Sequence, residues 1–199
     1  MESRAIAALE DVLGDGTPLA EVPVDAIATR AGISRSTFYL YFADKGELLA
    51  LATHWLKDQL FEVRVAPQED RSLDDLASYV TALERIIGRY REHAALLAAV
   101  NHAIQFDDRV GEQWVTAQNR YIAWVADILR TEQERGLTDD TFDAEAAADI
   151  LISGGEYVIA THVIRRDADE DAALARDLGA AQWYGFFRRR PSDESPRVP

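Results

Sequence analysis

Residues 34–41, SRSTFYLY, concentrate hydrogen-bond donors in one short segment of the chain. The donors are a guanidinium, two hydroxyls and two phenols: Arg35, Ser36, Thr37, Tyr39 and Tyr41. A helix over 35–42 places Phe38 and Phe42 on one buried face, four residues apart, and leaves the donors outside it. Such donors contact phosphates and base edges. The segment therefore predicts a helix suited to a DNA major groove rather than to a protein interior.

The residues before this segment predict the elements that position it. Val24 to Arg30 form a short helix, and residues 31–33 form a turn in which Gly32 supplies a positive φ. Ser34 follows as the cap of the next helix, because its hydroxyl can accept a hydrogen bond from the first turn. Two short helices joined by such a turn form a helix-turn-helix.

The stretch Ala31 to Lys45, AGISRSTFYLYFADK, closely resembles the DNA-binding signature of the TetR family of transcriptional repressors. Tyr121 to Gly136, YIAWVADILRTEQERG, resembles the subgroup that includes the repressor of the ethionamide-activating monooxygenase. The resemblance implies an all-α fold with an N-terminal three-helix helix-turn-helix domain and a C-terminal helical domain that binds a ligand and dimerises. We expect these domains at 1–47 and 48–190, followed by a disordered tail at 191–199.

The resemblance also implies roles on the DNA side. The predicted DNA-binding residues are Ser34, Arg35, Ser36, Thr37, Tyr39, Leu40, Tyr41 and Lys45. Arg35 and the two residues after it match base-reading positions, and arginine pairs with guanine through two hydrogen bonds. Leu40 can meet a thymine methyl, whereas Tyr39, Tyr41 and Lys45 match phosphate-binding positions. The alternatives are that the tyrosines only cover the domain surface and that Lys45 is a solvated helix end.

The charge of the chain opposes strong DNA binding. Its formal net charge is −14, and residues 1–47 carry four basic and eight acidic side chains. Affinity for any DNA follows the phosphates neutralised by Lys and Arg, so non-specific binding should be weak and sensitive to salt. Pro23 stands where the family usually has a capping Ser or Thr, which puts one phosphate contact in doubt.

Composition excludes several other classes of site. The chain has no cysteine, so it can form neither disulfides nor thiolate metal sites. Its four histidines lack metal-ligand spacing, and a polar loop is favoured over a metal site at His102, Asp107 and Asp108. No signal peptide is recognisable, and no apolar run approaches the roughly 20 residues of a membrane span. We therefore expect a cytoplasmic protein without metal, cofactor or membrane contact.

Apolar periodicity predicts helices along the rest of the chain. They are expected at residues 3–13, 44–65, 73–90, 94–104, 109–135, 143–166 and 169–190. The helix from Asp44 starts with a capping pattern completed by Glu47, and Gly136 ends its helix as a C-cap. The last two helices mix small and large apolar residues, which favours a two-fold homodimer interface over packing within one chain.

Aromatic residues of the second domain predict an effector site, because they fall on the helices that enclose the effector cavity in the family. The predicted ligand-binding residues are Tyr79, Tyr90, Phe106, Trp114, Tyr121, Trp124, Glu156 and Trp183. Such aromatics can equally be ordinary core. Two features favour a cavity: Gly154 and Gly155 lie inside an apolar helix, where they mark a close approach or a bend, and Glu156 places an acid beside them. A mostly apolar pocket with a polar group suits a small hydrophobic effector.

Together these features predict a ligand-responsive, homodimeric repressor that its effector releases from a DNA operator. One alternative is a protein of the same fold with little DNA affinity that binds a ligand or another protein. An enzyme is the other alternative. However, the sequence shows no nucleophile–base pair, metal-ligand spacing or phosphate-binding loop, so no catalytic residues are predicted.

Overall fold

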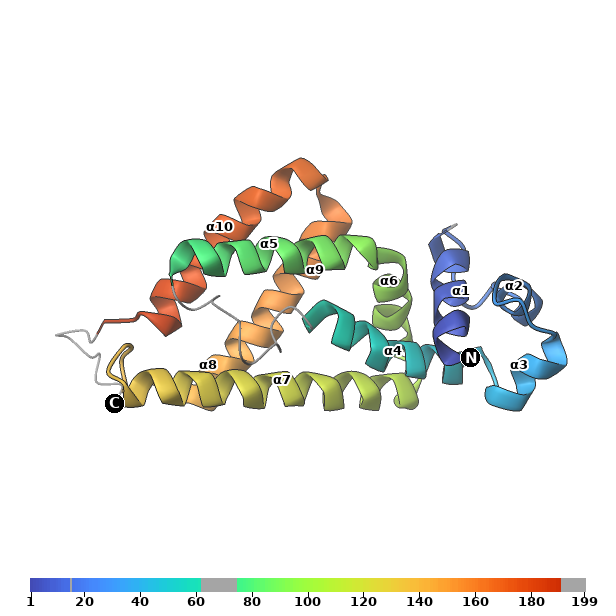
Figure 1. Cartoon of the computed structure of the whole chain (residues 1–199), viewed down its shortest axis with the longest axis horizontal. Helices are drawn as coiled ribbons and strands as arrows, with labels where there is room; N and C mark the ends of the chain where they lie inside the picture. Colours follow the sequence, from blue (N-terminus) through green and yellow to red (C-terminus); the bar gives the residue numbers. More distant parts are fainter. Residues whose placement is uncertain (15, 62–74, 191–199) are drawn as a thin grey trace. The chain divides into compact units, whose positions relative to one another are not determined.

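The computed structural model describes residues 1–14, 16–61 and 75–190, and within these ranges its regular elements are all helices. The first six α-helices are α1 Glu2–Gly14, α2 Val24–Arg30, α3 Arg35–Tyr41, α4 Lys45–Phe61, α5 Leu76–Glu92 and α6 Ala94–Ala103. The others are α7 Asp108–Glu134, α8 Ala144–Asp149, α9 Gly155–Arg165 and α10 Asp171–Gln182, with shorter turns η2 Ile150–Gly154, η3 Ala168–Glu170 and η4 Trp183–Phe187. This confirms the predicted all-α fold (Figure 1).

The described residues fall into two compact units, which we treat separately. The first comprises residues 1–61 and 89–117, and the second comprises residues 75–88 and 118–190. Helices α5 and α7 are each continuous in sequence from one unit into the other. The predicted domain boundary between residues 47 and 48 stays a prediction.

In the first unit, α1, α2 and α3 share a small core. Leu9, Ile27 and Phe38 each have no exposed surface, and Phe42 is also buried. The helical spacing that joins Phe38 to Phe42 brings their ring centroids to 5.2 Å. Gly32 adopts φ +68°, a conformation that glycine reaches without steric cost, and so confirms the predicted turn.

An ionic cluster fixes the start of α4 in the first unit. Asp44 accepts a hydrogen bond from the Glu47 N–H at 2.8 Å, which confirms the predicted cap. Arg109 lies 3.3 Å from the Asp44 carboxylate and 2.7 Å from that of Asp107. A Cβ at Gly46 would lie 2.5 Å from the Arg109 guanidinium, so a larger residue there would push the end of the Arg109 side chain aside.

These contacts shift the titration of both carboxyls in the cluster. The Glu47 backbone N–H, followed by Arg109, lowers the pKa of Asp44. The Arg109 side chain, as the largest cause, lowers the pKa of Asp107. Both carboxylates therefore contribute stability above their unfolded pKa values and lose it as the pH falls through their folded values.

In the second unit, residues Ala144–Arg165 form one helical run whose middle, η2, is a π-helical turn. The glycine pair, predicted to mark a close approach or a bend, lies where this turn meets α9. A Cβ at Gly155 would lie 3.0 Å from Gln182 Nε2, which makes this a close approach between helices. By length and composition alone this 22-residue run could cross a membrane, although the sequence analysis found no apolar run of that length. A partly buried core helix meets the same criterion, and 44% of the run's apolar window is buried.

The end of the chain departs from the predicted single helix at 169–190. The structure divides this segment into α10 and the π-helical turn η4, with η3 just before them. Thr138, in the loop after α7, donates a hydrogen bond to the Phe186 carbonyl, and Arg188 pairs with Glu132. These contacts hold the last turn within the second unit. The predicted tail at 191–199 lies outside the described residues, as does the predicted extension of α4 to residue 65.

Candidate functional site

Ser34 organises the start of α3. Its Oγ accepts a hydrogen bond from the Thr37 N–H at 3.0 Å, which confirms the predicted N-cap. The same Oγ lies 2.8 Å from the hydroxyl oxygens of Ser36 and Thr37. Three of the predicted DNA-binding hydroxyls therefore form one cluster at the N-terminus of this helix.

The two faces of α3 differ sharply in exposure. Phe38 is fully buried, whereas Leu40 is 82% exposed and Tyr41 is 54% exposed. Arg35, Ser36 and Tyr39 are exposed on the same short helix. Leu40 thus lies among donors that suit base edges and phosphates.

Arg35 is held by two neighbours. Its Nη1 donates to Asp25 Oδ2 on α2 at 3.0 Å, and its Nη2 donates to the Tyr39 hydroxyl at 3.4 Å. The guanidinium carbon also lies 5.4 Å from the centroid of the Tyr39 ring, a cation–π contact. The predicted base reader is therefore oriented by one carboxylate and one phenol.

The Lys45 ammonium is engaged by backbone carbonyls of the first unit. Its Nζ donates to the carbonyl oxygens of Leu19, Ala20 and Val22 at 2.6, 2.7 and 3.0 Å. An ammonium has three N–H donors, so these carbonyls use all of them. Lys45 can bind a phosphate only by giving up one of these contacts, and its predicted role stays a prediction.

The second unit brings together two of the predicted ligand-binding aromatics, Tyr79 on α5 and Trp183 on η4. Their ring centroids are 5.8 Å apart, and Phe187 lies 5.3 Å from Tyr79. The Tyr79 hydroxyl is 2.6 Å from Gln182 Oε1, and Gln182 Nε2 donates to the Leu151 carbonyl in η2. These contacts connect α5 and η4 to the π-helical turn η2.

The other predicted residues of this unit lie on α7 and α9. Tyr121 and Glu156 are buried, and Trp124 is half-buried. Arg120 donates to the Tyr121 hydroxyl at 3.3 Å. Gln118, also on α7, donates to Ser153 in η2 at 3.0 Å, so α7 too is linked to the π-helical turn.

Three predicted ligand-binding residues belong to the first unit, where their surroundings differ. Tyr90 is buried and Trp114 is half-buried, whereas Phe106 is 79% exposed. The Lys57 ammonium, fully buried on α4, lies 3.4 Å from the centroid of the Trp114 ring. Phe106 lines an apolar pocket of about 760 Å³ together with α6 and the loop after α1.

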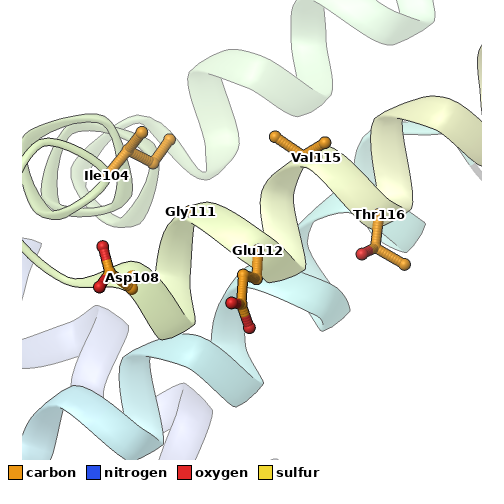
Figure 2. Close-up of a pocket in the computed structure, with 6 residues that line it drawn as sticks. All are labelled: Ile104, Asp108, Gly111, Glu112, Val115 and Thr116. Atoms are coloured by element: carbon orange, nitrogen blue, oxygen red, sulfur yellow. The ribbon is translucent and has the colours of Figure 1, made fainter.

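A second hollow of the first unit, about 500 Å³ in volume, lies along the N-terminal half of α7. Figure 2 shows Ile104, at the end of α6, beside the turns that carry Asp108, Glu112 and Val115. None of the predicted DNA-binding or ligand-binding residues is among those that line it.

Sequence models of two families match the chain. Bacterial regulatory proteins of the tetR family match residues 17–52, and the C-terminal domain of the transcriptional regulator EthR matches residues 79–178. The HTH-type transcriptional regulator EthR of Mycobacterium tuberculosis is 30% identical over 151 residues, which are 75% of this chain and 69% of that protein. The chain belongs to the TetR family.

Solved structures agree with this assignment. A TetR-like transcriptional regulator from Rhodococcus sp. RHA1 is 28% identical, with a TM-score of 0.61 over 92% of this chain and 96% of that one. FadR from Bacillus subtilis, solved in complex with stearoyl-CoA, is 16% identical and has a TM-score of 0.75 over 94% of this chain and 100% of that one. Because FadR is only 16% identical, this comparison shows that the two chains share a fold.

As a TetR-family protein, the chain is a DNA-binding transcriptional regulator. Regulators of the TetR family bind DNA operators and small-molecule effectors and form dimers. The relatives of this TetR-family chain are transcriptional regulators and not enzymes.

The sequence of this TetR-family regulator did not predict a role for two residues, Asp25 and Lys57. Asp25 contacts the predicted base reader, and the only sequence signal for it was an acid in the helix before α3. Lys57 lies at a core-facing position of α4, four residues after the buried Thr53. A charge on a buried stripe is a usable signal, because buried charges require compensation.

Proposed function

We propose that this regulator is a homodimeric repressor that a small hydrophobic effector releases from its operator. The observation that carries the DNA-binding part is the contrast between the two faces of α3. A capped helix that buries Phe38 and exposes Arg35, Tyr39 and Leu40 has the donors and the apolar contact that a major groove requires. Ser36, Thr37 and Tyr41 complete the proposed contact surface, and Ser34 fixes its start.

The effector part rests on the buried aromatics around the π-helical turn η2. Such turns replace regular helical hydrogen bonding and are frequent at functional sites. Tyr79 and Trp183 contact each other beside this turn, and Tyr121 is buried on α7, which also contacts it. FadR, a protein of the same fold, has been solved with stearoyl-CoA, which supports a long apolar ligand for this chain. Trp124 and Glu156 complete the proposed site in the second unit, whereas Tyr90, Trp114 and Phe106 of the first unit stay predictions.

Dimerisation through the last two helices is supported by the apolar side chains that they expose. Large apolar residues are exposed on η2, α9 and η4: Ile150, Tyr157, Val158, Ile164 and Tyr184. Monomers rarely expose such a group, and a two-fold interface would bury it twice. Gly179, by contrast, serves packing within the chain, because a Cβ there would lie 2.8 Å from Val80 of α5.

Release from DNA requires that the effector bind two conformations of the dimer with different affinity. In the repressing conformation the two α3 helices are spaced for successive major grooves of one operator. The effector favours another spacing and so lowers DNA affinity. An effector with the opposite preference would make the protein an activator.

The test is a binding selection from random duplex DNA by the purified protein at low and at physiological salt. Recovery of one inverted repeat is the expected result, and fatty acids and acyl thioesters added to that complex are then expected to weaken it. If no sequence is enriched even at low salt, DNA regulation is the wrong function. The chain would then be a ligand-binding or protein-binding module with the same fold, which its acidic first domain favours.

A further inference from the structure

We propose that Asp25 is a specificity-determining residue that positions the Arg35 guanidinium to read a guanine. The inference rests on the base-reading role proposed above for Arg35. It is carried by the contact between α2 and α3, in which Arg35 Nη1 donates to Asp25 Oδ2 at 3.0 Å while Nη2 donates to the Tyr39 hydroxyl at 3.4 Å.

The number of N–H donors on Arg35 decides whether Asp25 can stay bound to it when a guanine binds. Arginine has five N–H donors, of which Asp25 and Tyr39 use one each. One N–H on each terminal nitrogen and the Nε–H remain. A guanine needs only two of them, for its O6 and N7. Asp25, Tyr39 and a guanine can therefore bind Arg35 at the same time.

Holding the side chain before DNA arrives changes the free energy of binding. A solvated arginine samples many rotamers, and ordering it in the groove opposes binding. The carboxylate of Asp25 and the ring of Tyr39, 5.4 Å from the guanidinium carbon, order it beforehand. The guanine contact thus becomes stronger without any additional contact to DNA.

The carboxylate of Asp25 has a second effect, which does not depend on sequence. Asp25 and Arg35 are 64% and 56% exposed at their side chains, so the negative charge lies on the surface that faces DNA in the proposed complex. Arg35 keeps Asp25 as a partner on any sequence, and the charge of Asp25 repels the phosphates of all DNA alike. Asp25 therefore lowers affinity for every sequence through its charge, and it raises the preference for guanine only through its contact with Arg35.

Asp25→Ala tests this role, and Glu21→Ala is its matched control. Glu21 is an exposed acid in the loop before α2, so its removal changes the net charge equally without touching Arg35. Both variants are expected to unfold at the wild-type temperature, because ion pairs as exposed as that of Asp25 contribute little to stability. Equilibrium binding is then measured on the selected operator, on its single-base variants and on random duplex DNA.

Arg35→Ala first identifies the guanine, as the base whose replacement by adenine no longer matters. At that base, Asp25→Ala is expected to reduce the preference for guanine by about three- to ten-fold, while Glu21→Ala leaves the preference unchanged. Both variants should gain affinity for random DNA from the lost negative charge, and Asp25→Ala should gain at least as much as Glu21→Ala, because it also releases Arg35 for phosphates. Combining Asp25→Ala with Arg35→Ala should cause no further loss of preference, because the two act as one unit.

An unchanged or stronger guanine preference in Asp25→Ala would overturn the proposal and show Asp25 to be a competitor of DNA. Failure of the proposed function looks different. In that case the wild type itself has no sequence preference, or Arg35→Ala keeps the full preference of the wild type.

Discussion

Replacing Lys45 by methionine separates the two roles that this residue can have. Methionine keeps an unbranched apolar stem of similar length and removes the ammonium. In the free protein that ammonium donates to the carbonyls of Leu19, Ala20 and Val22, which form the connection between α1 and α2. If these bonds are its function, the substitution loosens the first three helices even without DNA.

The three hydrogen bonds of Lys45 set the expected loss of stability. A hydrogen bond to a charged group contributes about 1.5–3 kcal/mol to stability. The three bonds share one half-buried ammonium and are not additive, so we expect the loss of one to two such bonds, about 2–4 kcal/mol. Urea unfolding and amide hydrogen exchange of α1, α2 and α3 measure this loss, and the amides of the second unit provide the internal reference.

The salt dependence of DNA binding gives the second readout. A phosphate contact contributes about 0.9 to the slope of log K against log salt on duplex DNA. We expect Lys45→Met to weaken binding to all sequences through the lost folding energy while leaving this slope unchanged. Unaltered stability together with a slope smaller by about 0.9 would show that Lys45 binds phosphate, and the reasoning from its three carbonyl partners would be wrong.

Three further predictions concern the first unit. Arg35→Ala should remove about 1–3 kcal/mol of discrimination at one base, whereas Tyr39→Phe should weaken binding equally on all sequences. If both variants lost affinity equally across operator variants, the assigned roles would be wrong. Phe38→Ala should destabilise α1 to α3 by about 3–5 kcal/mol, since the ring is fully buried, and hydrogen exchange would then show α3 opening. Arg109 lowers the pKa of Asp107, so the stability that this pair contributes is present above about pH 4 and is lost on acidification. The urea midpoint of Arg109→Ala should therefore depend less on pH below about pH 4 than that of the wild type. Identical pH dependences of the two proteins would refute the coupling.

The helix-turn-helix could be predicted from sequence because its determinants are local. The turn needs a positive φ at Gly32, the cap needs a hydroxyl at Ser34, and the buried face needs two rings four residues apart. Each condition spans at most five residues, so the helical period alone relates it to the structure. Gly136, with φ +67°, ends α7 for the same local reason.

Partner choice could not be predicted, because it depends on residues far apart in the chain. Lys45 is bound by carbonyls 23 to 26 residues earlier, and Asp25 binds an arginine ten residues later. The pattern of residue types shows that the Lys45 side chain can reach a polar group, but it does not show which group. Only the packing of α4 against the loop before α2 shows that it reaches three carbonyls.

The effector residues show a different limit of sequence reasoning. A ring that lines a cavity and a ring that packs on another ring have the same helical spacing. Tyr79 and Trp183 contact each other, whereas Phe106, predicted by the same criterion, is exposed on the first unit. The irregularity at Gly154 and Gly155 was a stronger signal, because glycine opposes a regular helix.

The internal contacts of the cations explain how an acidic domain can still bind DNA selectively. In α2 to α4, Arg30 is paired with Asp11, Arg35 with Asp25, and the Lys45 ammonium with carbonyls. A phosphate backbone of arbitrary sequence must displace or share such partners, so the net gain from each contact is small and non-specific affinity stays low. In the proposed complex a guanine also shares Arg35 with Asp25 and Tyr39, but it accepts two hydrogen bonds at once through O6 and N7. In the proposed complex, discrimination therefore depends more on the Arg35 contact than on the total charge of the domain, and added salt should reduce non-specific binding before it reduces recognition of the operator.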